Sequence, residues 1–341
     1  MNKIIKLLKK MLKIIKSFLI IYFYFLVFII CSEDNYIFQL NKNVTRENIN
    51  FKNRFGLKIS ADLYKPLTFN NSLKYSSLII GPPIGGSKEQ APGVYCNEFA
   101  KRNFICLAIN SPFNDLNDDN SFYINSPELY SDTFSSAVDY LGLLTFIDRN
   151  KIGAIGISGG GSYALSAAAM DNRIKGVAVF SAFEFNEMKG KEKKLLIEKL
   201  SKQRWLDSEN GKQEYIPLFP EKPVNEIPDY LTDLKAELYS FYAFERGHQK
   251  KGKGGMTTTS YLSIQNYPLL NSIGDISPRP ILIVVCGNAK SKSFSDSIYE
   301  KAKEPKEYFI VPDCNHIDLY DDINKIPFDK TENFFIDSFD I

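Results

Sequence analysis

The 341-residue sequence predicts an α/β domain built on a doubly wound, mostly parallel sheet. Short unbroken apolar runs recur along the chain, and such runs are typical of strands buried on both faces. Helical segments lie between them: Phe134, Val138 and Leu141 repeat at helical spacing behind Asp132, a suitable N-cap. Alternating strands and helices indicate a parallel sheet with helices on both faces. The predicted buried strands are Leu78–Ile80, Phe104–Ile109, Ile152–Ile157, Val177–Phe180, Ile281–Val285 and Tyr308–Val311.

The domain is expected to begin near Asn43 with an antiparallel hairpin. Residues 57–63 alternate between apolar and polar side chains, which predicts a half-exposed strand. Arg54, Phe55 and Gly56 stand just before it and fit a turn. The hairpin therefore precedes the series of buried strands.

Residues 183–273 interrupt the alternation. They contain no buried-strand pattern and are rich in lysine, glutamate and aromatic residues, which predicts a mostly helical insertion between two core strands. The aromatic side chains fit either the packing of a small helical layer or a lid whose inner face lines a substrate pocket. The resulting division is a core of residues 43–182 and 274–341 with a lid-like insertion of residues 183–273.

The first 31 residues have the composition of a targeting segment. Six lysines between Lys3 and Lys16 precede an unbroken apolar run from Phe18 to Cys31. A basic region followed by a short apolar run is typical of a secretory signal peptide, and a membrane anchor is the alternative. Lipidation of Cys31 after cleavage is a third possibility. Because basic residues stay on the cytoplasmic side, the rest of the chain is expected to be exported or membrane-anchored, on the non-cytoplasmic side.

Charge and cysteine content exclude several classes of partner. The 42 basic residues are matched by 40 acidic ones, so the net charge of +2 predicts no nucleic-acid partner. The five cysteines form no C-x-x-C pair and predict neither a zinc site nor a disulfide framework. Cys106 and Cys286 lie inside apolar runs, where a free cysteine behaves as a small hydrophobe. We therefore expect neither a nucleic-acid partner nor a metal site.

Residues 156–160 read Gly-Ile-Ser-Gly-Gly and match the G-x-S-x-G nucleophile elbow. The motif follows a predicted buried strand directly and opens a helix of small residues, which is the setting that the chemistry requires. Gly156 and Gly160 allow the strand and helix to approach closely around Ser158. A phosphate-binding glycine turn would instead need G-x-G-x-x-G at the first strand–helix crossing. The motif therefore predicts Ser158 as a nucleophile and an α/β-hydrolase fold. Residues 183–273 then form the helical lid-like insertion of that fold.

A serine nucleophile needs a base, and the chain has two histidines. His316 follows the last predicted core strand, which is the place that the chain order Ser, acid, His requires. His248 lies in a basic, glycine-rich stretch of the insertion and is interpreted as a surface residue. His316 is therefore the predicted base.

Two backbone amides are predicted to bind the oxyanion. One is the amide of Gly159, directly after Ser158. The other comes from the turn after the first buried strand, which reads Gly-Pro-Pro-Ile-Gly-Gly over residues 81–86. The prolines have no N–H, so Ile84 is the expected donor.

The acid of a triad is the least defined member. The loop after the penultimate strand, residues 287–291, is its usual place and contains no carboxylate. Glu184 closes an earlier core strand, from which an acid can reach the same histidine, and it is our first choice. Asp296 is the second candidate, and Asn288 is a neutral alternative.

From about Phe51 to Phe335 the sequence resembles the dienelactone-hydrolase-like branch of bacterial α/β hydrolases. The resemblance implies hydrolysis of esters or related acyl compounds without a cofactor. An acyltransferase or a peptidase using the same site, or a non-catalytic binding protein of the same fold, are the alternatives. The stretches that carry the resemblance are Gly81-Pro82 through Lys88-Glu89-Gln90, Asp148-Arg149 with Ile152-Gly153, residues 156–160, Ser277 to Ile281, and His316 to Asp321.

Overall fold

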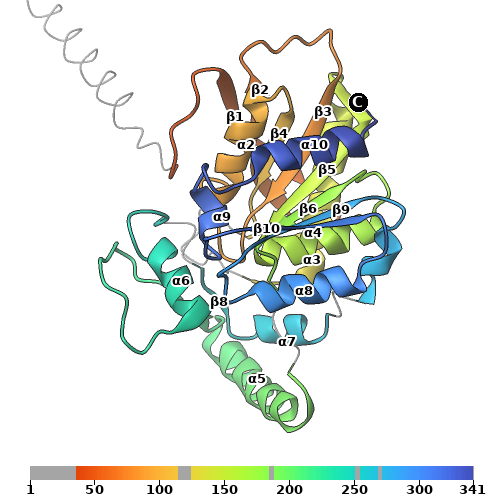
Figure 1. Cartoon of the computed structure of the whole chain (residues 1–341). Helices are drawn as coiled ribbons and strands as arrows, with labels where there is room; N and C mark the ends of the chain where they lie inside the picture. The colour runs from red at the N-terminus through yellow and green to blue at the C-terminus, as the bar shows by residue number, and fades with distance from the viewer. Residues whose placement is uncertain (1–35, 114–123, 184–187, 250–253, 268–270, 341) are drawn as a thin grey trace, which may run out of the picture. The chain divides into compact units, whose positions relative to one another are not determined.

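Eight strands form one sheet in the computed structural model, which describes residues 36–113, 124–183, 188–249, 254–267 and 271–340 (Figure 1). The strand order is β1-β2-β4-β3-β5-β6-β9-β10. β2 runs antiparallel to both of its neighbours, and every other pair in this sheet is parallel. The strands are β1 (Val44–Lys52), β2 (Lys58–Pro66), β3 (Tyr75–Gly81), β4 (Ile105–Ile109), β5 (Ile147–Ile157), β6 (Val177–Phe180), β9 (Ile281–Cys286) and β10 (Lys306–Val311).

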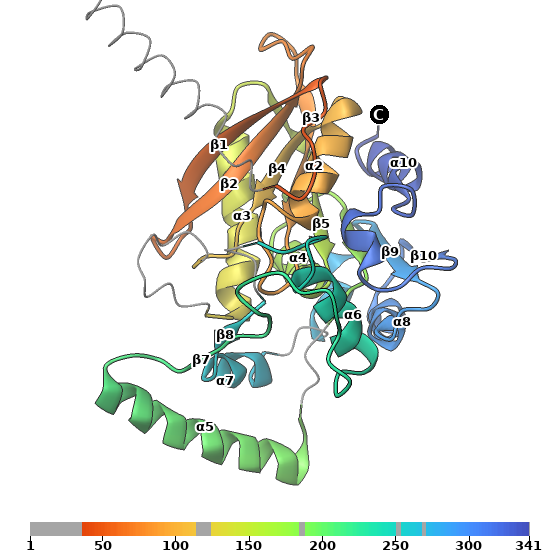
Figure 2. The ribbon, with the colours of Figure 1, turned by 90° about the vertical axis from the view of Figure 1, so that its left-hand side faces the viewer.

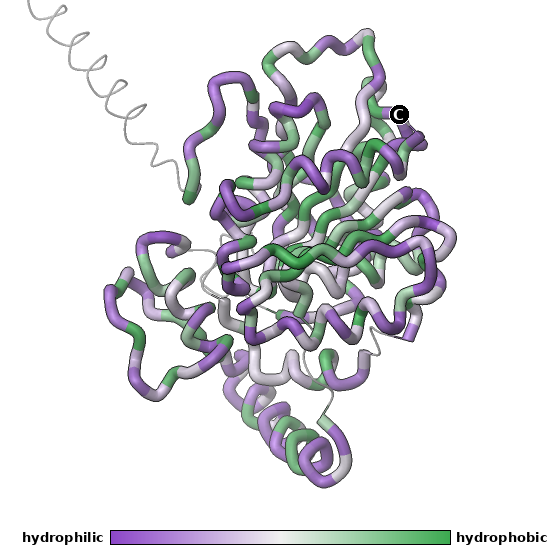
Figure 3. Tube along the Cα trace, in the orientation of Figure 1, coloured by the Kyte–Doolittle hydropathy of each residue, from purple (hydrophilic) through white to green (hydrophobic). Residues whose placement is uncertain are grey.

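Helices cover both faces of the sheet. Successive residues of a strand point to opposite faces, so each buried strand contributes to two apolar layers. α2 (Ala91–Lys101), α9 (Asp318–Asp321) and α10 (Phe328–Ser338) pack on one face. α3 (Pro127–Leu143), α4 (Gly159–Met170) and α8 (Lys292–Lys301) pack on the other. Figure 3 shows the apolar residues concentrated on the central strands. The predicted α/β-hydrolase fold class is confirmed.

The hairpin is present, but the prediction that its second strand is half-exposed is wrong. The turn between β1 and β2 contains Gly56 at a φ of +80°. The polar residues Ser60 and Asp62 of β2 are buried, because the loop before α2 covers this face of the strand. From that loop Lys88 forms a 2.8 Å ion pair with Asp62, which compensates the buried carboxylate.

The described chain between β6 and β9 contains helices joined by long irregular stretches, so it is less helical than its composition predicts. It contains α5 (Gly190–Asn210), α6 (Asp233–Tyr242), α7 (Ser260–Gln265) and the short 3₁₀ helix η2 (Ile273–Ile276). A small antiparallel ribbon of β7 (Tyr215–Ile216) and β8 (Met256–Thr257) was not predicted. α5 extends away from the sheet (Figure 2), and Leu200 is the buried residue among its 21. No helix within the described ranges is long and apolar enough to cross a membrane.

A disulfide joins Cys286 to Cys314, although the cysteine spacing predicted none. Cys286 ends β9 and Cys314 follows β10, so the register of these neighbouring strands brings the two Cα atoms to 5.1 Å. That separation lies within the normal range for a disulfide. The bridge spans 28 residues of sequence, and closing a loop of that length stabilises a fold by about 3–4 kcal/mol. It fixes two loops at the carboxyl end of the sheet to one another.

Two groups of predicted residues lie outside the described ranges. These are the N-terminal segment 1–31, with Cys31, and Glu184.

Candidate active site

Ser158 occupies a strained turn between β5 and α4. Its φ of 52° and ψ of −124° are unusual for a residue with a side chain. The turn is compact: a Cβ on Gly156 would collide with the backbone of Gly160, and one on Gly160 would collide with the carbonyl of Pro82. The Ser158 amide donates to the Phe180 carbonyl at 2.8 Å, which ties the turn to β6. Small residues therefore permit the elbow, as the motif predicts.

His316 meets Ser158 at the carboxyl edge of the sheet. It lies in the loop between β10 and α9, and its Nε2 is 3.0 Å from Ser158 Oγ. The imidazole is fully buried and Ser158 is only 6% exposed. The structure thus brings together the two residues that the sequence selects as nucleophile and base.

Burial sets the protonation state of the imidazole. It lowers the pKa of His316 to about 3, because the charged form loses its hydration. The ring is consequently neutral at neutral pH. In the tautomer that carries its proton on Nδ1, Nε2 is free to accept the hydroxyl proton of Ser158.

The partner of Nδ1 is a serine hydroxyl. Ser291 Oγ lies 2.5 Å from His316 Nδ1, and Ser291 is fully buried at the N-cap of α8. The sequence analysis missed it because a carboxylate or an amide, and not a hydroxyl, was expected to orient the histidine. Its position in the usual loop was the signal that could have found it.

The two alternative orienting residues have other surroundings. Asp296 accepts hydrogen bonds from Lys292 Nζ at 2.6 Å and from the Tyr308 hydroxyl at 2.5 Å. Asn288 is exposed, whereas His316 is buried. Neither prediction finds support in the described contacts of His316.

The two predicted oxyanion donors lie against one another. A Cβ on Gly159 would come within 2.5 Å of Ile84 Cγ1, so the Ile84 side chain packs directly over Gly159. Gly159 is the first residue of α4, and the first amides of an α-helix have no acceptor within the helix. The turn that carries Ile84 is closed by a hydrogen bond from the Gly86 amide to the Pro83 carbonyl, at 2.9 Å.

Comparison with known proteins defines the family. The uncharacterized protein PA2218 of Pseudomonas aeruginosa is 34% identical to this chain over 310 residues, a match covering 87% of this chain and 82% of PA2218. The crystal structure of PA2218 matches with a TM-score of 0.82, over 90% of this chain and 98% of that one. The α/β hydrolase GrgF of Penicillium sp. sh18 shares the fold, with a TM-score of 0.68 at 18% identity, over 87% of this chain and 100% of GrgF.

The chain belongs to one family with PA2218, and it has the α/β-hydrolase fold. The uncharacterized protein YcjY of Escherichia coli is also similar, at 28% identity over 293 residues, covering 83% of this chain and 94% of YcjY. No protein-family model matches the chain.

A second hydroxyl lies beside the predicted base. Tyr320 lies one helical turn after His316, and its hydroxyl is 3.1 Å from Nε2. Burial raises the pKa of Tyr320, so the phenol stays protonated and can donate to Nε2 or accept from Ser158. The i, i+4 spacing of His316 and Tyr320 was visible in the sequence, but it carries no signal of function by itself.

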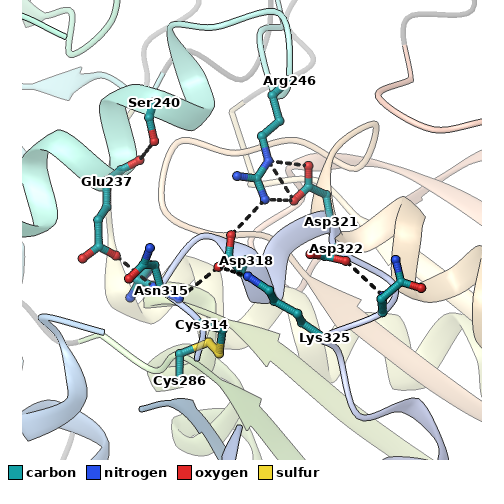
Figure 4. A network of polar contacts seen from close by, with 12 residues as sticks. Glu237, Ser240, Arg246, Cys286, Cys314, Asn315, Asp318, Asp321, Asp322 and Lys325 are labelled. Atoms are coloured by element: carbon teal, nitrogen blue, oxygen red, sulfur yellow. Dashed lines mark hydrogen bonds and ion pairs between the residues drawn. A yellow bond between two sulfur atoms is a disulfide. The ribbon is translucent and has the colours of Figure 1, made fainter. Parts of the chain in front are cut away.

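The insertion contacts the loop that carries the base (Figure 4). Arg246 pairs with Asp321 at 2.6 Å and with Asp318 at 3.3 Å. Glu237 of α6 accepts the backbone N–H of His316 at 2.9 Å. The insertion therefore helps to hold the segment that carries His316 in place.

Proposed function

We propose that the chain is a serine hydrolase that cleaves carboxylic esters or related acyl compounds through an acyl-enzyme on Ser158. The observation that carries this proposal is the 3.0 Å contact between His316 Nε2 and Ser158 Oγ at the elbow. His316 takes the hydroxyl proton while Ser158 Oγ attacks the acyl carbonyl, and the amides of Gly159 and Ile84 stabilise the oxyanion. The proton then passes from His316 to the leaving alcohol. A water molecule, deprotonated by His316, releases the acid and restores Ser158.

We propose Ser291 as the group that orients His316, in place of a carboxylate. Its Oγ accepts a hydrogen bond from Nδ1–H and so holds the tautomer that leaves Nε2 free. A neutral hydroxyl provides no charge to stabilise the imidazolium that forms in the transition state, whereas an aspartate would. We therefore expect turnover below that of enzymes with a complete Ser-His-Asp triad. Glu184, the choice from sequence, stays a prediction.

The test of this function is product analysis with short acyl esters. The purified protein should release free carboxylic acid from short-chain p-nitrophenyl esters without an added metal or cofactor. Transfer of the acyl group to an added alcohol or amine in preference to water would identify an acyltransferase. Cleavage of peptides but not esters would identify a peptidase. Absence of turnover with every acyl compound would favour a non-catalytic binding protein. The proposal that the substrates are esters rests on the stretches of sequence that resemble dienelactone-hydrolase-like proteins.

The pH dependence of kcat/KM should reflect the buried base. Because burial lowers the pKa of His316 from 6.5 to about 3, the base stays neutral as the pH falls through the range where a free histidine is protonated. We expect the acid limb of kcat/KM for the free enzyme to lie below pH 6.5. A midpoint at or above 6.5 would contradict this and would indicate a carboxylate beside the ring. Measurements must stay above the pH of unfolding, since the unfolded chain binds this proton first and stability falls below pH 6.5.

We propose that the catalytic domain acts outside the cytoplasm. The lysine-rich, apolar N-terminal segment supports export or anchoring, and the Cys286–Cys314 disulfide suits an oxidising compartment. If native cells are denatured in an alkylating agent without reductant, Cys96 and Cys106 should be alkylated at once. Cys286 and Cys314 should react only after reduction. Alkylation of all four in the first step would contradict export.

A further inference from the structure

A carboxylate from the insertion holds the backbone of the base. Glu237 lies on α6, and its Oε2 accepts the His316 N–H at 2.9 Å (Figure 4). Hydrogen bonds from a neutral donor to an ionised acceptor are about twice as strong as those between neutral groups. The contact is therefore suited to fixing where the His316 backbone lies, and with it the ring.

The same carboxylate also reaches the neighbouring loop. The backbone of Lys290 lies close enough to Glu237 to stabilise its charge, so the same side chain faces the loop after β9 as well as the loop after β10. Lys290 immediately precedes Ser291, the partner of Nδ1. Burial raises the pKa of Glu237, whereas the nearby backbone N–H groups of His316 and Lys290 favour its ionised form. The carboxylate therefore lies between the backbone of the base and that of its orienting residue.

The two loops are also held together from the side of the sheet. The Cys286–Cys314 disulfide joins their starting points, and the Asn288 amide donates to the Cys314 carbonyl at 3.1 Å. These contacts fix the beginning of each loop. Glu237 lies against residues further along the two loops, at His316 in one and at Lys290, next to Ser291, in the other.

Ion pairs anchor the insertion to the helix that follows the base. Arg246, four residues after the end of α6, donates to Asp321 through both Nε and a terminal nitrogen. It also contacts Asp318, which accepts the Asn315 N–H at 3.0 Å and pairs with Lys325 at 2.7 Å. The segment carrying Glu237 is thus attached to the chain just after His316, which limits how far the carboxylate can move.

We propose that Glu237 is a positioning residue for the base: its carboxylate sets the distance from His316 Nε2 to Ser158 Oγ by holding the backbone of His316. This rests on the proposed function of Ser158 and His316. The insertion then contributes to catalysis itself, in addition to any role as a lid.

The test compares three substitutions of Glu237 in the full chain, by turnover per active site. A fluorophosphonate counts the reactive sites, and kcat is divided by that count so that unfolded protein does not contribute. In Glu237→Ala, kcat per site and the rate constant of fluorophosphonate labelling should both fall about tenfold, with KM little changed, because a small displacement of a catalytic group is costly. In Glu237→Asp, whose shorter side chain cannot span the gap, kcat per site and the labelling rate constant should fall by a similar factor. Glu237→Gln keeps an acceptor oxygen and should retain most of the activity.

The matched control is Glu245→Ala, which removes the same charge from an exposed position in the insertion. It should leave both rates within about twofold of the wild type. If Glu237→Ala reacted at wild-type rates per site, the positioning role would be overturned and the proposed function would stay intact. If the alanine variant does not fold, the same conclusion applies to Glu237→Asp. Failure of the wild-type protein to react at Ser158 would overturn both.

Discussion

Ser158→Ala should lower kcat for short acyl esters by about 10⁶-fold, to the level left by binding and the oxyanion amides. The reason is that the hydroxyl 3.0 Å from His316 Nε2 is the atom that forms the acyl-enzyme. Without it, no covalent intermediate can form. The measurement is steady-state hydrolysis of p-nitrophenyl esters, with circular dichroism to verify the fold.

Ser162→Ala provides the matched control on the same helix. Ser162 lies one turn further along α4, and its hydroxyl is already engaged with the Phe183 carbonyl at 2.9 Å. Its removal should leave kcat within about threefold. If Ser158→Ala retained wild-type turnover, Ser158 could not be the nucleophile.

Ser291→Ala should lower kcat by about 100-fold, the second largest loss that we expect. The substitution removes the acceptor 2.5 Å from His316 Nδ1 and lets the ring adopt the wrong tautomer. Loss of the correct tautomer in a carboxylate triad costs about 10⁴-fold, and a neutral hydroxyl should account for less. The measurement is kcat for the same esters, with the melting temperature to verify folding.

Glu184→Gln decides between the two proposals for the orienting group. If Ser291 has this role, Glu184→Gln should change kcat by no more than about threefold. If kcat fell by about 10⁴-fold in Glu184→Gln and stayed near the wild-type value in Ser291→Ala, Glu184 would be the orienting group and Ser291 would be rejected. Asp296→Asn should have little effect, since that carboxylate is engaged by Lys292 and Tyr308.

Local patterns were sufficient for the fold and for two residues of the site. The six predicted strands correspond to β3, β4, β5, β6, β9 and β10, because a strand buried on both faces must be apolar throughout. The prediction that the last of them is buried is wrong: β10 is the edge strand of the sheet, and Ile310 is 48% exposed. The elbow was recognisable because only small residues fit around Ser158. His316 was recognisable as the base because it stands after the last strand and the sequence contains only two histidines.

The rest of the site depends on contacts between segments far apart in the sequence. The Cys286–Cys314 bridge arises from the pairing of β9 with β10, which spacing alone does not reveal. Glu237 reaches His316 across 79 residues of chain, through an insertion with no recognisable pattern. Ser291 was overlooked because a hydroxyl is an unusual partner for the histidine, although Ser291 stands in the loop where the acid is expected. The polar side chains of β2 were expected at the surface, whereas Lys88 from a later loop covers Asp62.

The most direct test of the account is to locate the adduct of a fluorophosphonate on the wild-type protein by peptide mass spectrometry. The account predicts one phosphonyl group per chain, on Ser158, and its absence in His316→Ala under the same conditions, because the hydroxyl reacts only when Nε2 accepts its proton. An unmodified Ser158 in protein that hydrolyses esters, or an adduct on Ser158 that forms equally fast without His316, would contradict it.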